Sequence, residues 1–192
     1  MVITQNDVNN DMKLISESIE DINRPLVSPS QALKLAMLWP GLCIGGYFVA
    51  AAWMLITFTV PNDGSIFNQV DPLIHYIGGN LAFFALALGF ALAIGGGLYG
   101  PALFYLTIPD EVRKNSILIR SLKKTARRSG VFFLVCNLAL AGLALFYRDA
   151  LFGAPFLLII SFLIVQGIVS AEMTRFGIAP VMKKLISLTR KI

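Results

Sequence analysis

Four long stretches of this sequence contain no Asp, Glu, Lys or Arg, and they limit the fold more than any other feature. They are residues 35–62, 72–109, 129–147 and 150–171. A helix that crosses a bilayer needs roughly 17–25 apolar residues, so each stretch can supply one span. Only 14% of the chain is charged, whereas a soluble domain carries about 25% charge. We therefore predict an all-α polytopic membrane protein with four transmembrane helices, and we exclude a soluble enzyme, a disordered chain and a disulfide-stapled secreted domain.

The basic residues predict the orientation of these spans. Fifteen of the 16 Lys and Arg residues lie in the two terminal segments and in the segment between the second and third spans, and the remaining one is Arg148. Cytoplasmic loops are enriched in Lys and Arg, so we expect four spans with both termini in the cytoplasm. Residues 1–34 are polar and net acidic, and this is unlike a cleavable signal peptide.

The net charge of +5 and the basic cluster in residues 113–128 favour contact with an anionic surface. Basic residues beside a span usually determine topology and attract anionic lipid headgroups. We therefore expect a lipid bilayer with an anionic inner leaflet to face this segment, and no direct nucleic acid partner.

Apolar runs and turn signals divide the chain into three parts. Residues 1–34 are predicted to form a cytoplasmic acidic amphipathic helix and linker, 35–171 a four-helix transmembrane domain, and 172–192 a basic cytoplasmic tail helix. The spans are expected at about 39–60, 73–97, 131–147 and 150–171, with a basic cytoplasmic helix at about 109–128.

Proline, glycine and capping residues set the expected helix ends. The uncharged residues 72–109 would reach about 57 Å as one helix, well beyond the roughly 30 Å hydrocarbon core, so we expect a break at the glycines 95–97 or at Gly100-Pro101. Ser28 is predicted to cap one helix and Thr107 another. Gly130 is expected to end the basic helix.

An apolar stripe runs along the N-terminal segment with the 4, 3, 4, 3, 4 spacing of a helical seam. Its members are Val8, Met12, Ile15, Ile19, Ile22 and Leu26. The acidity of this segment disfavours an anionic membrane surface. The stripe is therefore predicted to pack against the protein's own basic helices, a second copy or a different partner.

A second candidate for partner binding lies in span two, where a small residue recurs at every fourth position. The members of this small-residue ladder are Ala85, Gly89, Ala93 and Gly97. Small residues allow another helix to approach closely in a membrane. The ladder is predicted to pack within the protein, against a partner's helix or against a second copy.

Few residues could carry chemistry. The predicted spans contain no charged residue, and His75 is the only histidine. Ion-coupled transporters and most membrane enzymes need clustered titratable groups. We expect no enzymatic activity, no catalytic or metal site and no cofactor, and we expect Cys43 and Cys136 to remain free thiols.

Two polar residues lie at matching depth in the predicted hairpin of spans three and four. Asn137 is about six residues from the cytoplasmic end of its span, and Gln166 is about six from the cytoplasmic end of the next. We predict a hydrogen bond between their side chains, which would stabilise the helix pair by about 0.6–2 kcal/mol.

The acidic N-terminal segment, the Ser28-Pro29 break, Leu38-Trp39-Pro40-Gly41-Leu42 and the short-looped spans together resemble one family. The stretch that carries the likeness is about residues 28–45, and the chain resembles the entry-exclusion proteins of F-type conjugative plasmids. The resemblance implies a bacterial inner-membrane protein that blocks redundant DNA transfer by binding a transfer protein of the donor cell.

Three functions remain open from the sequence. The first is a non-enzymatic recognition or regulatory protein with a membrane protein partner, of which entry exclusion is the sharpest form. The second is an accessory structural subunit of a larger membrane complex, of the secretion or respiratory type. The third is a small oligomeric transporter or channel. A homo-oligomer is compatible with each of them.

Overall fold

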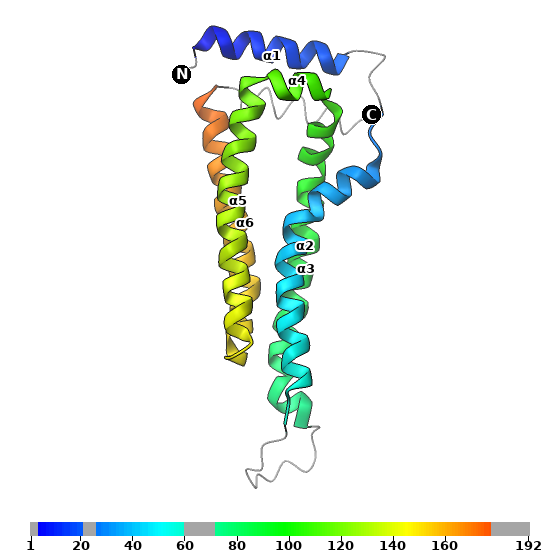
Figure 1. The fold of residues 1–192 in the computed structure, drawn as a ribbon, viewed down its shortest axis with the longest axis vertical. Helices are drawn as coiled ribbons and strands as arrows, with labels where there is room; N and C mark the ends of the chain where they lie inside the picture. Colours follow the sequence, from blue (N-terminus) through cyan, green and yellow to red (C-terminus); the bar gives the residue numbers. More distant parts are fainter. Residues whose placement is uncertain (1–3, 21–25, 60–71, 178–192) are drawn as a thin grey trace. The chain divides into compact units, whose positions relative to one another are not determined.

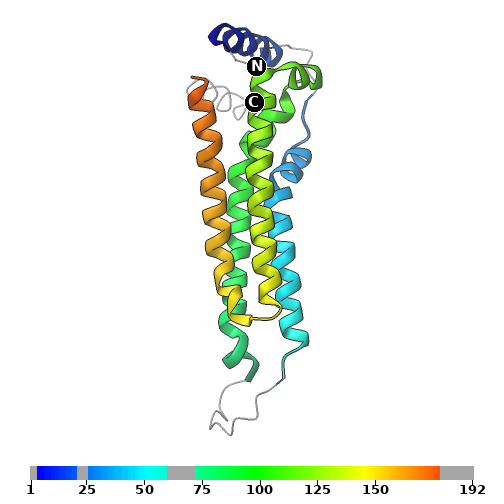
Figure 2. The ribbon, with the colours of Figure 1, turned by 60° about the vertical axis from the view of Figure 1, so that its left-hand side comes forward.

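The structure is a computed structural model that describes residues 4–20, 26–59 and 72–177, and every regular element in these ranges is a helix (Figures 1 and 2). The elements are α1 (Gln5–Glu20), α2 (Pro29–Ile56), α3 (Pro72–Thr107), α4 (Asp110–Asn115), α5 (Ile117–Ala144), the 3-10 helix η1 (Arg148–Gly153) and α6 (Ala154–Arg175). Ile22, the loop 61–71 and the tail beyond residue 177 lie outside the described residues.

Four of the described helical segments are long and apolar enough to cross a membrane. They are Pro29–Ile56, Ile77–Thr107, Ile117–Ala144 and Arg148–Arg175. Backbone N–H and C=O groups must be satisfied internally in lipid, and a helix does this within one segment. The all-α fold with four candidate spans is therefore confirmed, and it indicates a multi-pass membrane protein.

The chain divides into two compact units. The terminal unit comprises Met1–Leu38, Gly95–Val131 and Leu163–Ile192, and the hairpin unit comprises Trp39–Ile94 and Phe132–Phe162. In the terminal unit, α1 lies alongside α4 and the first turns of α5 (Figure 1). The hairpin unit contains α2 from Trp39 onward, α3 up to Ile94, the second half of α5, η1 and the start of α6.

The predicted break in span two is wrong, because α3 continues as one helix from Pro72 to Thr107 and includes Pro101. Glycine and proline are tolerated in membrane helices where neighbouring groups satisfy the backbone. Phe104 in the last turn of α3 and Ile108 directly after the helix are buried in the terminal unit. This burial favours helix over a turn at the glycines, and it is a tertiary contribution that local sequence does not show.

The predicted end of the basic helix at Gly130 is also wrong. The chain leaves the helix at Ser116, which has an extended ψ of 122°, and α5 then runs from Ile117 through Gly130 to Ala144. The basic segment and span three are therefore one helix. Thr107 does not cap α4, since its hydroxyl donates to the Leu103 carbonyl within α3 at 2.9 Å.

Local capping explains where α1 and α2 begin. The Thr4 backbone N–H and hydroxyl donate to Asp7 Oδ2 at 2.9 and 2.7 Å, and the Asp7 N–H donates back to Thr4 Oγ1 at 3.3 Å. These bonds lower the pKa of the Asp7 carboxyl below its usual value. The second helix begins at Pro29, directly after Ser28 as predicted, and Gln31 N–H donates to the Ser28 carbonyl at 3.0 Å.

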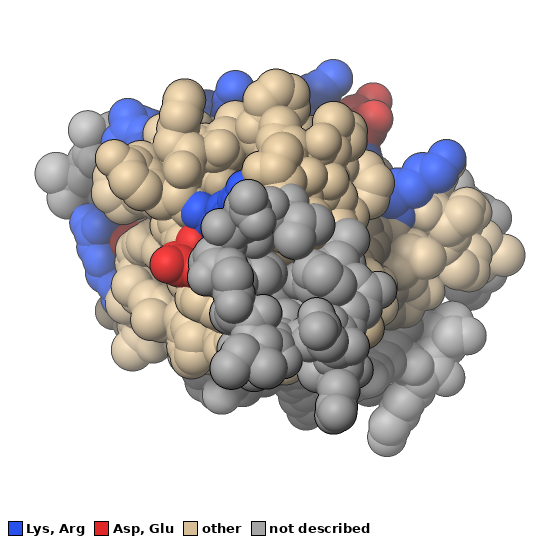
Figure 3. Space-filling model, turned by 90° about the horizontal axis from the view of Figure 1, so that it is seen from below, with Lys and Arg blue, Asp and Glu red and all other residues tan. Residues whose placement is uncertain are grey.

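The hairpin unit is packed through small and aromatic side chains. The Phe83 and Phe152 rings meet edge to face with centroids 4.8 Å apart. A Cβ placed on Gly46 would come within 2.7 Å of Leu138 Cδ2, so a larger residue there would require the Leu138 side chain to move. Seen from below in Figure 3, uncharged residues cover most of the described surface. Many large apolar side chains on the spans remain exposed. This surface is suited to lipid.

Candidate functional site

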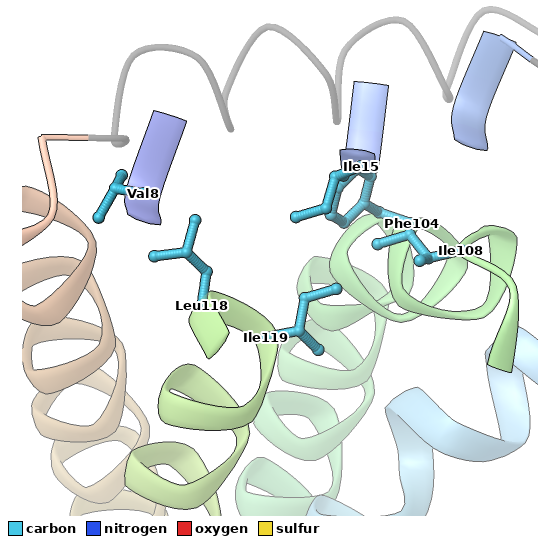
Figure 4. Packing of buried hydrophobic residues seen from close by; sticks show 6 residues of the cluster. All are labelled: Val8, Ile15, Phe104, Ile108, Leu118 and Ile119. Atoms are coloured by element: carbon cyan, nitrogen blue, oxygen red, sulfur yellow. The ribbon is translucent and has the colours of Figure 1, made fainter. Parts of the chain in front are cut away.

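The apolar stripe of α1 packs against the protein's own helices. Val8 and Ile15 are buried, with 7% and 1% of their surface exposed (Figure 4). Met12 and Ile19 pack against the same cluster. The other buried members are Phe104 from α3, Ile108 directly after that helix, and Leu118 and Ile119 from α5. Of the three occupants that the sequence left open for this stripe, the structure selects the intramolecular one for the four members in α1.

Asp11 ties α1 to the start of α5 by polar contacts. Its Oδ2 accepts the Ser116 hydroxyl and the Leu118 backbone N–H, both at 2.8 Å. The Ser116 hydroxyl oxygen in turn accepts the Ile119 N–H at 3.1 Å. The first N–H groups of a helix lack intrahelical partners, and a carboxylate is favourable at that positive end. Asp11 is therefore a cap supplied from another helix, and the sequence showed it only as part of an acidic run.

Asn137 is the centre of a buried polar cluster in the hairpin unit. Tyr47 Oη donates to Asn137 Oδ1 at 2.9 Å. Asn137 Nδ2 donates to Ser161 Oγ at 3.1 Å and to the Phe133 carbonyl at 2.8 Å. The cluster joins α2, α5 and α6, and buried polar groups that are paired in this way specify how helices meet.

The predicted partner Gln166 does not occupy this cluster. Ser161 is the residue on α6 that bonds Asn137, whereas the Gln166 side chain is exposed. Gln166 follows Ser161 along α6 by a rise of about 7.5 Å. Depth counted from the span ends was therefore too coarse to identify the partner of Asn137. Tyr47 and Ser161, two polar residues within apolar runs, were the available signals in the sequence.

The small-residue ladder of α3 faces outward. Ala85, Gly89, Ala93 and Gly97 are all exposed, whereas Ala87, Ala91 and Ile94 form the buried face of the same helix. A Cβ added at Gly89 or Gly97 would meet no atom within 4 Å. Among the described residues, then, nothing packs closely on these glycines. The ladder therefore leaves this face of α3 open to close approach by a second helix.

Titratable side chains are sparse and scattered in the described ranges. No group of three His, Cys, Asp or Glu residues there could hold a metal ion. Cys43 is buried on α2 and Cys136 is partly buried on α5, and both are free thiols. The side chain of His75 lies outside the described residues. The most extensive polar arrangements among the described residues are the contacts that Asp11 and Asn137 make between helices.

No family model, no curated protein and no solved structure matches this chain.

Proposed function

We propose that the chain is a non-enzymatic membrane recognition protein whose docking surface is the outward face of α3. The observation that carries the proposal is the exposure of the small-residue ladder (Ala85, Gly89, Ala93 and Gly97). Lipid tails solvate large apolar side chains as well as small ones, whereas small residues let two helix backbones approach closely and gain dispersion contacts. The stripe of α1, the other candidate surface, is already covered.

The orientation forms part of the proposal. Fifteen of the 16 basic residues lie on the side that carries both termini in a four-span arrangement. Positively charged loops are retained in the cytoplasm. We therefore place both termini in the cytoplasm of a bacterium, with the spans in its inner membrane. The partner is then another membrane protein whose helix reaches α3 within the bilayer.

Entry exclusion is the specific form of this proposal, and it rests on the resemblance around residues 28–45. In that role the protein in a plasmid-bearing recipient binds a transfer protein of an incoming donor and blocks redundant DNA transfer. A mating assay tests this directly, because recipients that express the chain should receive a matched conjugative plasmid less often. An unchanged frequency of plasmid transfer would rule out entry exclusion and would leave the wider class of recognition proteins open.

Replacing Gly89 by Leu is expected to reduce partner capture or exclusion at least tenfold, which corresponds to about 1.4 kcal/mol. The new side chain projects into open space in the isolated chain, so membrane insertion and the amount of protein should not change. Gly45→Leu is the matched control, since Gly45 is also exposed and a Cβ added there would meet no atom within 4 Å, but it lies on α2. Normal activity of the Gly89 variant would contradict the proposed surface.

Affinity purification in mild detergent separates recognition from permanent assembly. The full chain would carry a C-terminal tag at native expression level, and co-purifying proteins would be quantified. Partner recovery at less than stoichiometric amounts, dependent on Gly89, is expected for a recognition protein. Constant stoichiometric recovery with other membrane subunits would identify an accessory subunit instead.

A further inference from the structure

A basic groove of about 650 Å³ runs along the first turns of α5. Its lining consists of Arg120, Lys123, Lys124, Arg127, Arg128 and Val131. The five cations are spaced 3, 1, 3 and 1 residues apart, which places them on one face of the helix over a rise of about 12 Å. Leu118 and Ile119 are on the buried side of the same helix, against α1. The five basic residues themselves are exposed.

The positive charge of this groove is not neutralised by the ion pairs of the described residues. Those pairs join Lys13 to Glu17, Arg113 to Asp110 and Arg175 to Glu172, and none includes a groove residue. Residues 117–128 contain no acid at all. Several like charges on one concave surface focus a field that concentrates counter-ions. The groove therefore attracts anions.

Tyr105 fixes one of the cations. Lys123 Nζ donates to Tyr105 Oη at 3.0 Å, and the same ammonium lies 5.6 Å from the centre of the Tyr105 ring. A lysine held in this way loses part of its rotamer freedom before any ligand arrives, so less entropy is lost on binding. The lining is thus partly preorganised.

The position of the groove along α5 indicates what kind of anion it receives. The basic residues end at Arg128, residues 129–147 are uncharged, and the exposed Val131 closes the groove at the apolar end. In a bilayer, phosphate groups lie at this transition from charged to apolar surface. The orientation of the spans depends on how many basic residues a loop carries. Orientation alone therefore does not explain why all five basic residues lie on one face of the helix.

We propose that this groove binds the phosphate of an anionic phospholipid, with Val131 beside the start of an acyl chain. The guanidinium groups of Arg127 and Arg128 contact the phosphate oxygens, because a guanidinium fork matches phosphate geometry. The chain's own C-terminal segment is a poor occupant, since residues 173–192 carry basic residues and no acid. The site is separate from the α3 surface and does not depend on the proposed function.

Lipid binding to the purified full chain in mild non-ionic detergent tests the proposal. Native mass spectrometry would measure the Kd for dioctanoyl phosphatidylglycerol and, in parallel, for dioctanoyl phosphatidylcholine. We expect at least tenfold tighter binding of phosphatidylglycerol. The double substitution Arg127→Gln and Arg128→Gln is expected to abolish this preference. Both side chains are exposed, and Gln is a good helix former, so the fold should be retained.

The matched control is Lys34→Gln with Lys114→Gln, which removes the same charge from exposed positions of the same unit outside the groove. It should keep the tenfold preference. An equal loss of this lipid preference in both double variants would overturn the proposal, because net charge alone would then explain the binding. Equal binding of the two lipids would also overturn it, as would displacement of phosphatidylglycerol by inorganic phosphate at the same concentration, which would identify a small-anion site.

Discussion

Replacing Ile15 by Asp is expected to release α1 from the helices it covers. Ile15 is 1% exposed at the centre of the cluster with Phe104 and Ile108. Truncating such a side chain costs about 2–5 kcal/mol, and a buried unpaired carboxylate adds to this. Because this penalty falls on one docked helix, α1 should detach while the spans remain inserted. Hydrogen exchange of the α1 amides should then approach that of an unprotected chain.

The neighbouring residue supplies the control for this experiment. Leu14 is 42% exposed, so Leu14→Asp introduces the same charge into the same helix without burying it. Exchange in that variant should stay close to the parent protein. Equal acceleration in both variants would mean that helix propensity or net charge holds α1 in place, and would contradict the role assigned to the cluster.

Replacing Asn137 by Ala is expected to destabilise the hairpin unit by about 1–3 kcal/mol. The substitution removes the partner of the Tyr47 hydroxyl and of the Ser161 hydroxyl, and both would remain in a buried environment. An unsatisfied buried group costs about 1–3 kcal/mol, although hydrogen bonds between membrane helices average nearer 0.6 kcal/mol. The free energy of unfolding in mixed detergent and lipid micelles, titrated with a denaturing detergent, measures the loss.

Gln166→Ala distinguishes the observed cluster from the pairing that the sequence suggested. Its side chain is exposed, so the free energy of unfolding should change by less than about 0.5 kcal/mol. The double variant Asn137→Ala with Ser161→Ala should cost less than the sum of the single variants, because the two residues share a bond. A large effect of Gln166→Ala together with an additive double variant would contradict the cluster.

Helix content and the number of spans were predictable because they depend on local composition. Uncharged runs such as 35–62 and 150–171 have few alternatives to a helix in lipid. The break at Gly95–Gly97 and the stop at Gly130 were predicted wrongly, since local glycine signals were weighed without the packing of Phe104 and without the bonds from Ser116 and Leu118 to Asp11. Both outcomes depend on contacts between segments that lie far apart in the chain.

The sequence by itself determined an all-α membrane chain, the start of α2 at Pro29 and the two candidate docking surfaces. Only the tertiary structure decided which of those surfaces is covered within the chain. It buries Val8 and Ile15 and leaves Gly89 exposed. Periodicity shows that a helix has a distinct face, because that follows from 3.6 residues per turn. What covers the face depends on which other segments reach it, and this information is spread over the whole chain.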